Sequence, residues 1–180
     1  MKACTLYYDS DSIRCSQFAR KLAAYNKAFS LVPAGSPEPI TFNANEAAGF
    51  IFISTKGRPD PQIERIMRNI VMGKNGYIFI LILGGTRTLT TIKHVHDLLA
   101  SRGMKLANAY TESSLKKISP DEDTVFQKIS VDVQDEVKVL DRVQKEVESL
   151  PTAEIRKLMH QYIRDYLKEQ RHSRHHKDVQ

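Results

Sequence analysis

Apolar residues in the first 110 positions follow two kinds of pattern: short dense runs and longer segments with helical spacing. The dense runs at 2–8, 49–54 and 77–83 do not alternate with polar residues, which is typical of strands buried on both faces of a sheet. Shorter runs at 40–43 and 104–110 predict two further strands. Because strands and helices alternate with short connections, we predict an α/β fold, a doubly wound sheet of five parallel strands between two helical layers.

Helical spacing predicts three helices between these strands. The first covers 13–30, has Ser12 or Asp11 as its N-cap and carries large apolar residues along one side. The second begins after Asp60, which can cap it. The third ends at Gly103, because glycine commonly stops helices.

The composition changes beyond Pro120, where charged and helix-favouring residues continue to Pro151. We predict one domain at 1–148 and, at 149–180, a further helix followed by a basic, histidine-rich tail. The C-terminal helix has a broad apolar stripe that needs a partner surface. That surface is either its own domain or a second copy of the chain, which would make the protein a homo-oligomer.

Composition and charge exclude several classes of protein. Hydrophobic residues make up 41% of the chain and charged residues 27%, which is ordinary for a globular domain. No apolar run approaches the ~20 residues that span a bilayer, and no signal peptide is visible, so we expect a cytoplasmic protein without membrane contact. The net charge of +6 is too small to indicate nucleic-acid binding. Cys4 and Cys15 lack metal or redox spacing, which predicts reduced, buried thiols.

Ligands of open parallel sheets bind outside the carboxyl ends of the strands. In the first loop there, backbone N–H groups and the positive end of the following helix form a natural phosphate site, with Ser10 and Ser12 as further donors. The same residue types also cap helices and turn the chain, and the sequence leaves both interpretations open. The four loops at this edge are 9–14, 55–58, 84–87 and 111–114.

The order of these elements resembles the flavodoxin-like family. The most similar stretch is Gly76 to Tyr110, with a buried strand, a Gly-Gly loop, a helix ending in Ser-Arg-Gly and a short last strand. Leu6-Tyr7-Tyr8 before a hydroxyl-containing loop is also similar. The resemblance implies strand order 2-1-3-4-5, bound FMN and electron transfer to a redox partner protein, with the flavin supplying the redox chemistry.

The resemblance also implies where FMN would lie. The phosphate would occupy the loop after the first strand, and the isoalloxazine ring would lie between the loops after the third and fourth strands. The implied cofactor-binding residues are Ser10, Asp11, Ser12, Ile13 and Arg14 on the phosphate side, and Thr55, Lys56, Gly57, Arg58, Gly84, Gly85, Thr86 and Arg87 on the ring side.

The loops also differ from the family's pattern, which favours a second hypothesis. The first loop has Asp9 and Asp11 and no glycine, and a carboxylate ~4 Å from a phosphate costs about 1 to 4 kcal/mol at surface-like dielectric. The ring-side loops lack an aromatic residue and carry Lys56, Arg58 and Arg87 instead. These three cations suit an anionic ligand or an acidic partner surface, so the alternative is a cofactor-free interaction module that uses them and the C-terminal helix.

A third hypothesis is a Mg²⁺-dependent phosphotransferase. Asp9-x-Asp11 directly after an apolar strand resembles the first motif of haloacid-dehalogenase-type enzymes, in which the first Asp is the nucleophile and the second the acid/base. In this resemblance Ser54 or Thr55 would supply the family's hydroxyl. The chain has no acidic pair after a later strand to complete the metal site.

Overall fold

The computed structural model describes residues 2–35, 46–73 and 76–140. Within this part of the chain, no helix is long and apolar enough to cross a bilayer. The strand predicted at 40–43 and the C-terminal helix and tail predicted at 149–180 lie outside the described residues, so neither prediction is tested.

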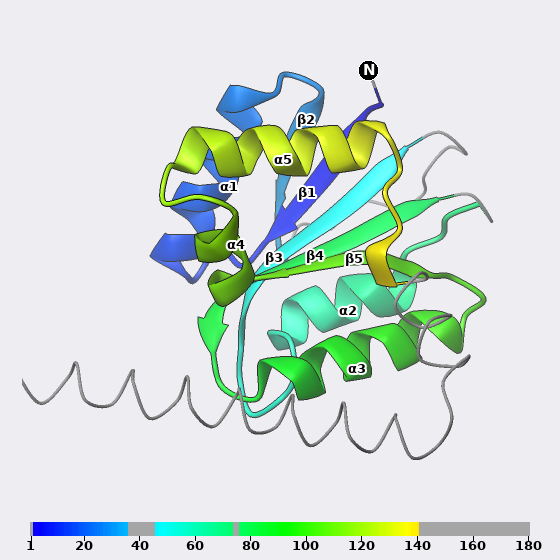
Figure 1. Cartoon of the computed structure of the whole chain (residues 1–180). Coiled ribbons are helices and arrows are strands. Elements are labelled where there is room, and N and C mark those ends of the chain that lie inside the picture. The colour runs from blue at the N-terminus through cyan, green and yellow to red at the C-terminus, as the bar shows by residue number, and fades with distance from the viewer. Residues whose placement is uncertain (1, 36–45, 74–75, 141–180) are drawn as a thin grey trace, which may run out of the picture. The chain divides into compact units, whose positions relative to one another are not determined.

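Five parallel strands form one sheet in the order β2-β1-β3-β4-β5 (Figure 1). This order confirms the predicted doubly wound α/β fold. The chain adds β2 on one side of β1 and then β3, β4 and β5 on the other side, so the sheet grows in both directions. The strands are β1 (Cys4–Tyr8), β2 (Phe29–Pro33), β3 (Ala47–Ser54), β4 (Tyr77–Gly85) and β5 (Leu106–Thr111).

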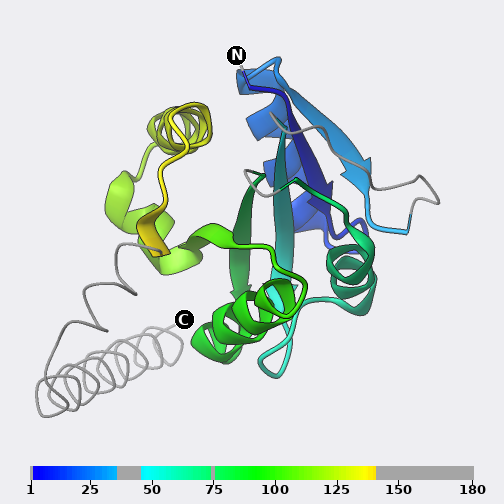
Figure 2. The same cartoon turned by 90° about the vertical axis from the view of Figure 1, so that its right-hand side faces the viewer.

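Helices cover both faces of the sheet. Buried residues of α1, α4 and α5 share one core cluster, and those of α2 and α3 share the other. Figure 2 shows α4 and α5 on one side of the sheet and α2 and α3 on the opposite side. The helices are α1 (Ile13–Tyr25), α2 (Pro61–Asn69), α3 (Thr88–Ala100), α4 (Glu112–Ile118) and α5 (Glu122–Gln134).

Local capping explains where the helices begin. The Ser12 side chain accepts the N–H of Cys15, and the Asp60 side chain accepts the N–H of Gln62. These bonds satisfy amides that have no partner within the helix, so both residues act as the predicted N-caps.

The first helix is shorter than predicted. It ends at Tyr25, because Asn26 is extended and its side-chain oxygen accepts the N–H of Ala28. Phe29 then opens β2 and pairs with Cys4 of β1. The prediction of helix through residue 30 was therefore wrong, although Phe29 is buried in the core as its apolar character suggested.

The core extends along both faces of the central strands. Phe50, Ile51 and Phe52 of β3 are fully buried in sequence, as the absence of alternation predicted. Cys4 and Cys15 are free and buried, and burial raises the pKa of the Cys15 thiol to about 11. The predicted burial of both thiols is confirmed.

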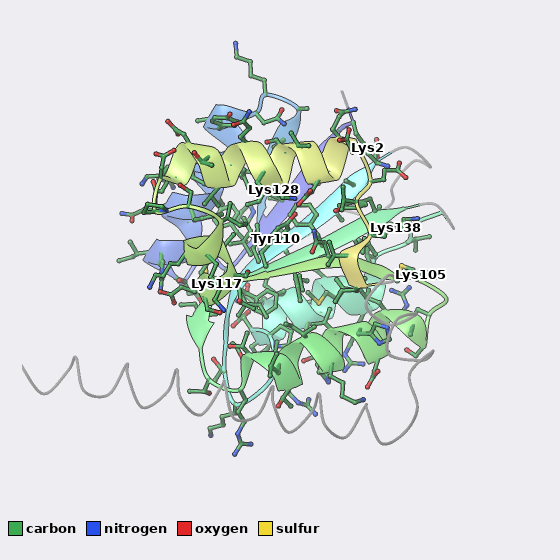
Figure 3. The ribbon with its side chains drawn as sticks, in the orientation of Figure 1. Lys2, Lys105, Tyr110, Lys117, Lys128 and Lys138 are labelled. Atoms are coloured by element: carbon green, nitrogen blue, oxygen red, sulfur yellow. The ribbon has the colours of Figure 1, made fainter. Side chains whose placement is uncertain are left out.

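A buried polar network attaches α5 to β5. The Tyr110 hydroxyl donates to Asp132 over 2.6 Å and accepts from the Asn108 amide over 2.9 Å. Lys128 pairs with the same carboxylate; Figure 3 labels Tyr110 on β5 and Lys128 on α5. Burial, followed by the hydrogen bond to Asp132, raises the pKa of Tyr110, which therefore remains a donor.

Candidate functional site

The carboxyl ends of the parallel strands bring the predicted loops to one edge of the sheet. Two close approaches join them. A Cβ added at Gly84, at the end of β4, would lie 3.2 Å from Arg14 Nη1 and 3.2 Å from Glu112 Oε2. The backbone N–H of Lys56 donates to Thr86 Oγ1 over 3.2 Å, which links the loops after β3 and β4. The loops thus lie together as predicted.

The loop after β1 is closed by one of its own carboxylates. Asp9 Oδ1 accepts the backbone N–H of Asp11 over 3.0 Å and that of Ser12 over 3.2 Å. The Ser10 hydroxyl is directed to the carbonyl of Ala34, 3.5 Å away. Two amides and one hydroxyl of this loop are therefore bonded to acceptors within the chain.

The loop after β1 also lies in a negative environment. Partial burial raises the pKa of Asp9, hydrogen bonds from the amides of Asp11 and Ser12 oppose that shift, and the negative charges of Asp60 and Asp11 add to it. Three carboxylates thus act on the position where the family resemblance places a phosphate.

Arg14 is held by an ion pair across the edge. Its Nη2 lies 2.9 Å from Oε1 of Glu112, and its Nη1 donates to Oε2 over 3.2 Å. Lys116 donates to the same carboxylate over 2.8 Å. The hydrogen bond from Arg14 is the main reason that the pKa of Glu112 is lowered. Glu112 lies in the predicted loop at 111–114 but was not among the predicted site residues.

The loop after β3 is a tight turn. The backbone groups of Thr55 and Arg58 exchange hydrogen bonds of 2.9 and 3.1 Å. The two residues between them, Lys56 and Gly57, have positive φ angles of 53° and 86°. This combination is the type I′ turn, which holds its two ends close together.

The loops after β3 and β4 are bonded to each other. The N–H of Thr86 donates to the carbonyl of Ser54 over 2.9 Å, and the Ser54 hydroxyl donates back to the carbonyl of Thr86 over 2.6 Å. Ser54 Oγ also lies 2.5 Å from Thr91 Oγ1 on α3. Of the predicted ring-side residues, Thr86 therefore joins the two loops through Ser54, which was not in that set.

Gly85 allows the closest approach between these loops. Its φ is +99°, and a Cβ at this position would lie 1.9 Å from the carbonyl oxygen of Ser54. Only glycine fits both the backbone angle and the contact.

Three basic side chains project from this edge. Lys56, Arg58 and Arg87 are exposed, and none has an ion pair with another described residue. A Cβ added at Gly57 would lie 3.5 Å from the Cβ of Arg87, so the turn carrying two of the cations lies against the third. We call Lys56, Arg58 and Arg87 the basic rim.

The phosphotransferase hypothesis gains no support at this edge. Among residues 2–35, 46–73 and 76–140, no group of three or more histidine, cysteine or acidic side chains is placed to hold a metal ion. Ser54 is 2% exposed and its hydroxyl is bonded within the chain, so it does not face a substrate.

The described residues do not fit an FMN phosphate. Asp9 takes the amides of Asp11 and Ser12, Ser12 Oγ accepts from the helix, and Arg14 is paired with Glu112. Ile13, also predicted on the phosphate side, presents an aliphatic side chain that is 75% exposed. A phosphate would have to displace these contacts and approach neighbouring carboxylates.

A cavity of about 280 Å³ lies beside Arg14, between α1, α4 and α5. It is lined by residues of all three helices and by Leu83 of β4. No sequence motif marks it, because its walls come from segments about 100 residues apart.

Comparisons with known proteins find only distant structural likenesses. No family model matches the sequence, and no curated protein is significantly similar to it. A flavoprotein in complex with FMN from Lactobacillus acidophilus NCFM has a TM-score of 0.49 and 14% identity, covering 65% of this chain and 97% of that one. Rubredoxin oxygen:oxidoreductase from Desulfovibrio gigas has a TM-score of 0.49 and 13% identity, over 74% of this chain and 36% of that one.

A response regulator from Colwellia psychrerythraea has a TM-score of 0.46 and 11% identity, over 74% of this chain and 98% of that one. Likenesses this distant carry no functional argument. The strand order itself gives the classification. The fold is flavodoxin-like. Because fold does not determine function, the activity of this flavodoxin-like domain has to be argued from its loops.

Proposed function

We propose that this flavodoxin-like domain works without FMN, as an interaction module whose basic rim binds an acidic surface of a partner protein. One observation carries the proposal. The Asp9 carboxylate accepts hydrogen bonds from the amides of Asp11 and Ser12, two donors of the loop in which a flavin phosphate would lie.

Replacing that carboxylate by a phosphate is unfavourable. The displaced Asp9 would remain beside the incoming anion, close enough to Asp60 and Asp11 that their charges already raise its pKa. Each charge pair at ~4 Å costs on the order of 1 to 4 kcal/mol at surface-like dielectric. Arg14 offers little compensation, because its guanidinium is already paired with Glu112.

The basic rim supplies the features that an acidic partner requires. Its three cations are exposed and have no carboxylate partner among the described residues. Leu89, in the first turn of α3 after Arg87, is 39% exposed and offers apolar contact beside the charges. Charges arranged in this way accelerate association with an oppositely charged surface and make it sensitive to salt.

FMN binding with electron transfer is the competing hypothesis, supported by the strand order and by the Gly84-Gly85 loop. It is tested by titrating FMN into the purified full chain and following flavin fluorescence. We expect no saturable quenching at micromolar FMN. Saturable quenching in that range would overturn the cofactor-free proposal.

Two matched variants test the role given to the carboxylate. Asp9→Ser and Asp11→Ser each remove one negative charge, but only Asp9 accepts the loop amides. We expect Asp9→Ser to bind FMN about tenfold more tightly than Asp11→Ser does. Riboflavin lacks the phosphate, so Asp9→Ser should bind it no more tightly than Asp11→Ser does. Equal FMN binding by the two variants would contradict the assignment.

The basic rim is tested with a labelled ten-residue polyglutamate peptide as the acidic probe. Fluorescence anisotropy at low salt should detect binding by the full chain and its loss when Lys56, Arg58 and Arg87 are all changed to Gln. A triple variant with the same charge change, built from exposed residues elsewhere, should keep the binding. If both variants lose it equally, general net charge explains the binding and the rim assignment fails. The control residues are Arg20, Lys27 and Arg65.

Self-association through the C-terminal helix stays a prediction, because 149–180 lies outside the described residues. A redox partner protein also stays a prediction, because it would follow only from flavin binding.

A further inference from the structure

The cavity between α1, α4 and α5 has an apolar floor. Leu83 of β4, Leu115 of α4 and Val125 of α5 line it and are 3%, 7% and 5% exposed, and Phe18 of α1 lines it as well. Its volume of about 280 Å³ is close to the lower end of small-ligand pockets, roughly 300 Å³. The space therefore suits one ring system or a short branched chain.

Two ion pairs join residues that line the cavity. Arg14 of α1 pairs with Glu112 of α4, and Lys21 of α1 pairs with Glu122 of α5 over 2.6 Å. Arg14 and Lys21 are seven residues apart, which is about 10 Å along a helix. The two pairs are therefore spaced on α1 by about the length of a small molecule.

The charges around the cavity do not balance. Glu122 offsets Lys21, whereas Glu112 is shared between Arg14 and Lys116. One positive charge therefore remains at the Glu112 end. Lys116 is the more available of the two cations there, because its side chain is 73% exposed and makes one hydrogen bond to the carboxylate, whereas Arg14 makes a two-pronged contact.

We propose that this cavity binds a small amphipathic monoanion, an aromatic or branched aliphatic carboxylate. Its apolar body lies on Phe18 and Leu115, and its carboxylate is bound by Lys116. A neutral apolar molecule would leave the surplus charge unmatched, and a nucleotide would exceed both the volume and the charge. The inference is independent of the basic rim, which extends from β3 and β4 rather than from this helical layer.

The experiment uses the full chain and a fluorescent aryl sulfonate, 8-anilinonaphthalene-1-sulfonate, as the reporter anion. We expect saturable binding with one site per chain. The carboxylate 4-phenylbutyrate should displace the reporter about three to five times more effectively than the neutral alcohol 4-phenylbutan-1-ol. No saturable binding, or equal displacement by the acid and the alcohol, would overturn the proposal.

Two lysine variants locate the anion. Lys116→Gln should weaken displacement by the carboxylate about three- to fivefold and leave the alcohol unchanged. Lys93→Gln is the matched control, because Lys93 also makes an ion pair four residues along its helix, with Asp97, but lies on α3. Equal effects of the two substitutions would refute the assignment. Both lysines are exposed, and circular dichroism verifies that both variants fold.

Discussion

The contact between Gly85 and Ser54 makes a sharp prediction about Gly85→Ala. An alanine Cβ would lie 1.9 Å from the carbonyl oxygen of Ser54 and 2.8 Å from its backbone nitrogen. Neither atom can rotate away, since both belong to the backbone of β3. The substitution therefore has to separate the loops after β3 and β4.

The expected cost combines strain with lost hydrogen bonds. A non-glycine residue at a φ of +99° carries about 1 to 3 kcal/mol of backbone strain. Separation of the loops also removes the bonds between Ser54 and Thr86, each worth about 1 kcal/mol. Alanine also restricts the unfolded chain more than glycine does, which offsets this cost by about 0.4 to 1 kcal/mol. We expect Gly85→Ala to lower the free energy of unfolding by about 3 kcal/mol.

Gly103→Ala is the control for backbone strain alone. Gly103 has a φ of +72°, and a Cβ added there would meet nothing within 4 Å. Its expected cost is about 1 kcal/mol, the strain of a left-handed residue less the entropy gain. Urea unfolding followed by circular dichroism measures both variants, and a difference of about 2 kcal/mol corresponds to roughly 1 M in midpoint. If the two variants unfold at the same urea concentration, the loops after β3 and β4 are not rigidly joined.

Two further predictions concern the layer of α1, α4 and α5. Tyr110→Phe removes a donor from the buried Asp132 and an acceptor from Asn108, so we expect the free energy of unfolding, measured in urea, to fall by about 2 to 3 kcal/mol. Tyr25→Phe is the control, because Tyr25 is 45% exposed, and it should cost almost nothing. Equal effects of the two substitutions would contradict the network. The pKa of Glu112 is lowered in the folded chain, mainly by the hydrogen bond from Arg14, so its contribution to stability is present above about pH 4.5 and lost as pH falls through the folded pKa. The unfolding midpoints of the parent and Glu112→Gln should therefore converge as pH falls from 7 to 3, and a constant gap between them would contradict the ion pair.

The central part of the fold could be predicted from the sequence because burial dominates it. The dense apolar runs at 49–54 and 77–83 lie within β3 and β4, and Asp60 followed by Pro61 marks the start of α2. The prediction of helix through residue 30, where β2 begins at Phe29, was wrong for a local reason. Phe29 continues the helical spacing of α1, and only the hydrogen bonds around Asn26 show that the helix has already ended.

The candidate site could be predicted only in part. Parallel topology brings the loops of Lys56 and Thr86 to one edge, as expected. Aspartate commonly accepts amides two residues ahead, so the closure by Asp9 was accessible to local reasoning. The ion pair between Arg14 and Glu112 was not, because it joins residues 98 positions apart and depends on how two helices pack.

The carboxylate of Asp9 is a permanent part of the loop that it organises. A domain whose loop binds a soluble anion is stabilised by that anion through mass action. Its folded population therefore depends on the concentration of the ligand. Here the anion is the carboxylate of Asp9, which belongs to the chain itself, so its presence does not depend on a ligand concentration. The abundance of the folded domain should therefore stay the same in cells starved of riboflavin and in cells that have it in excess.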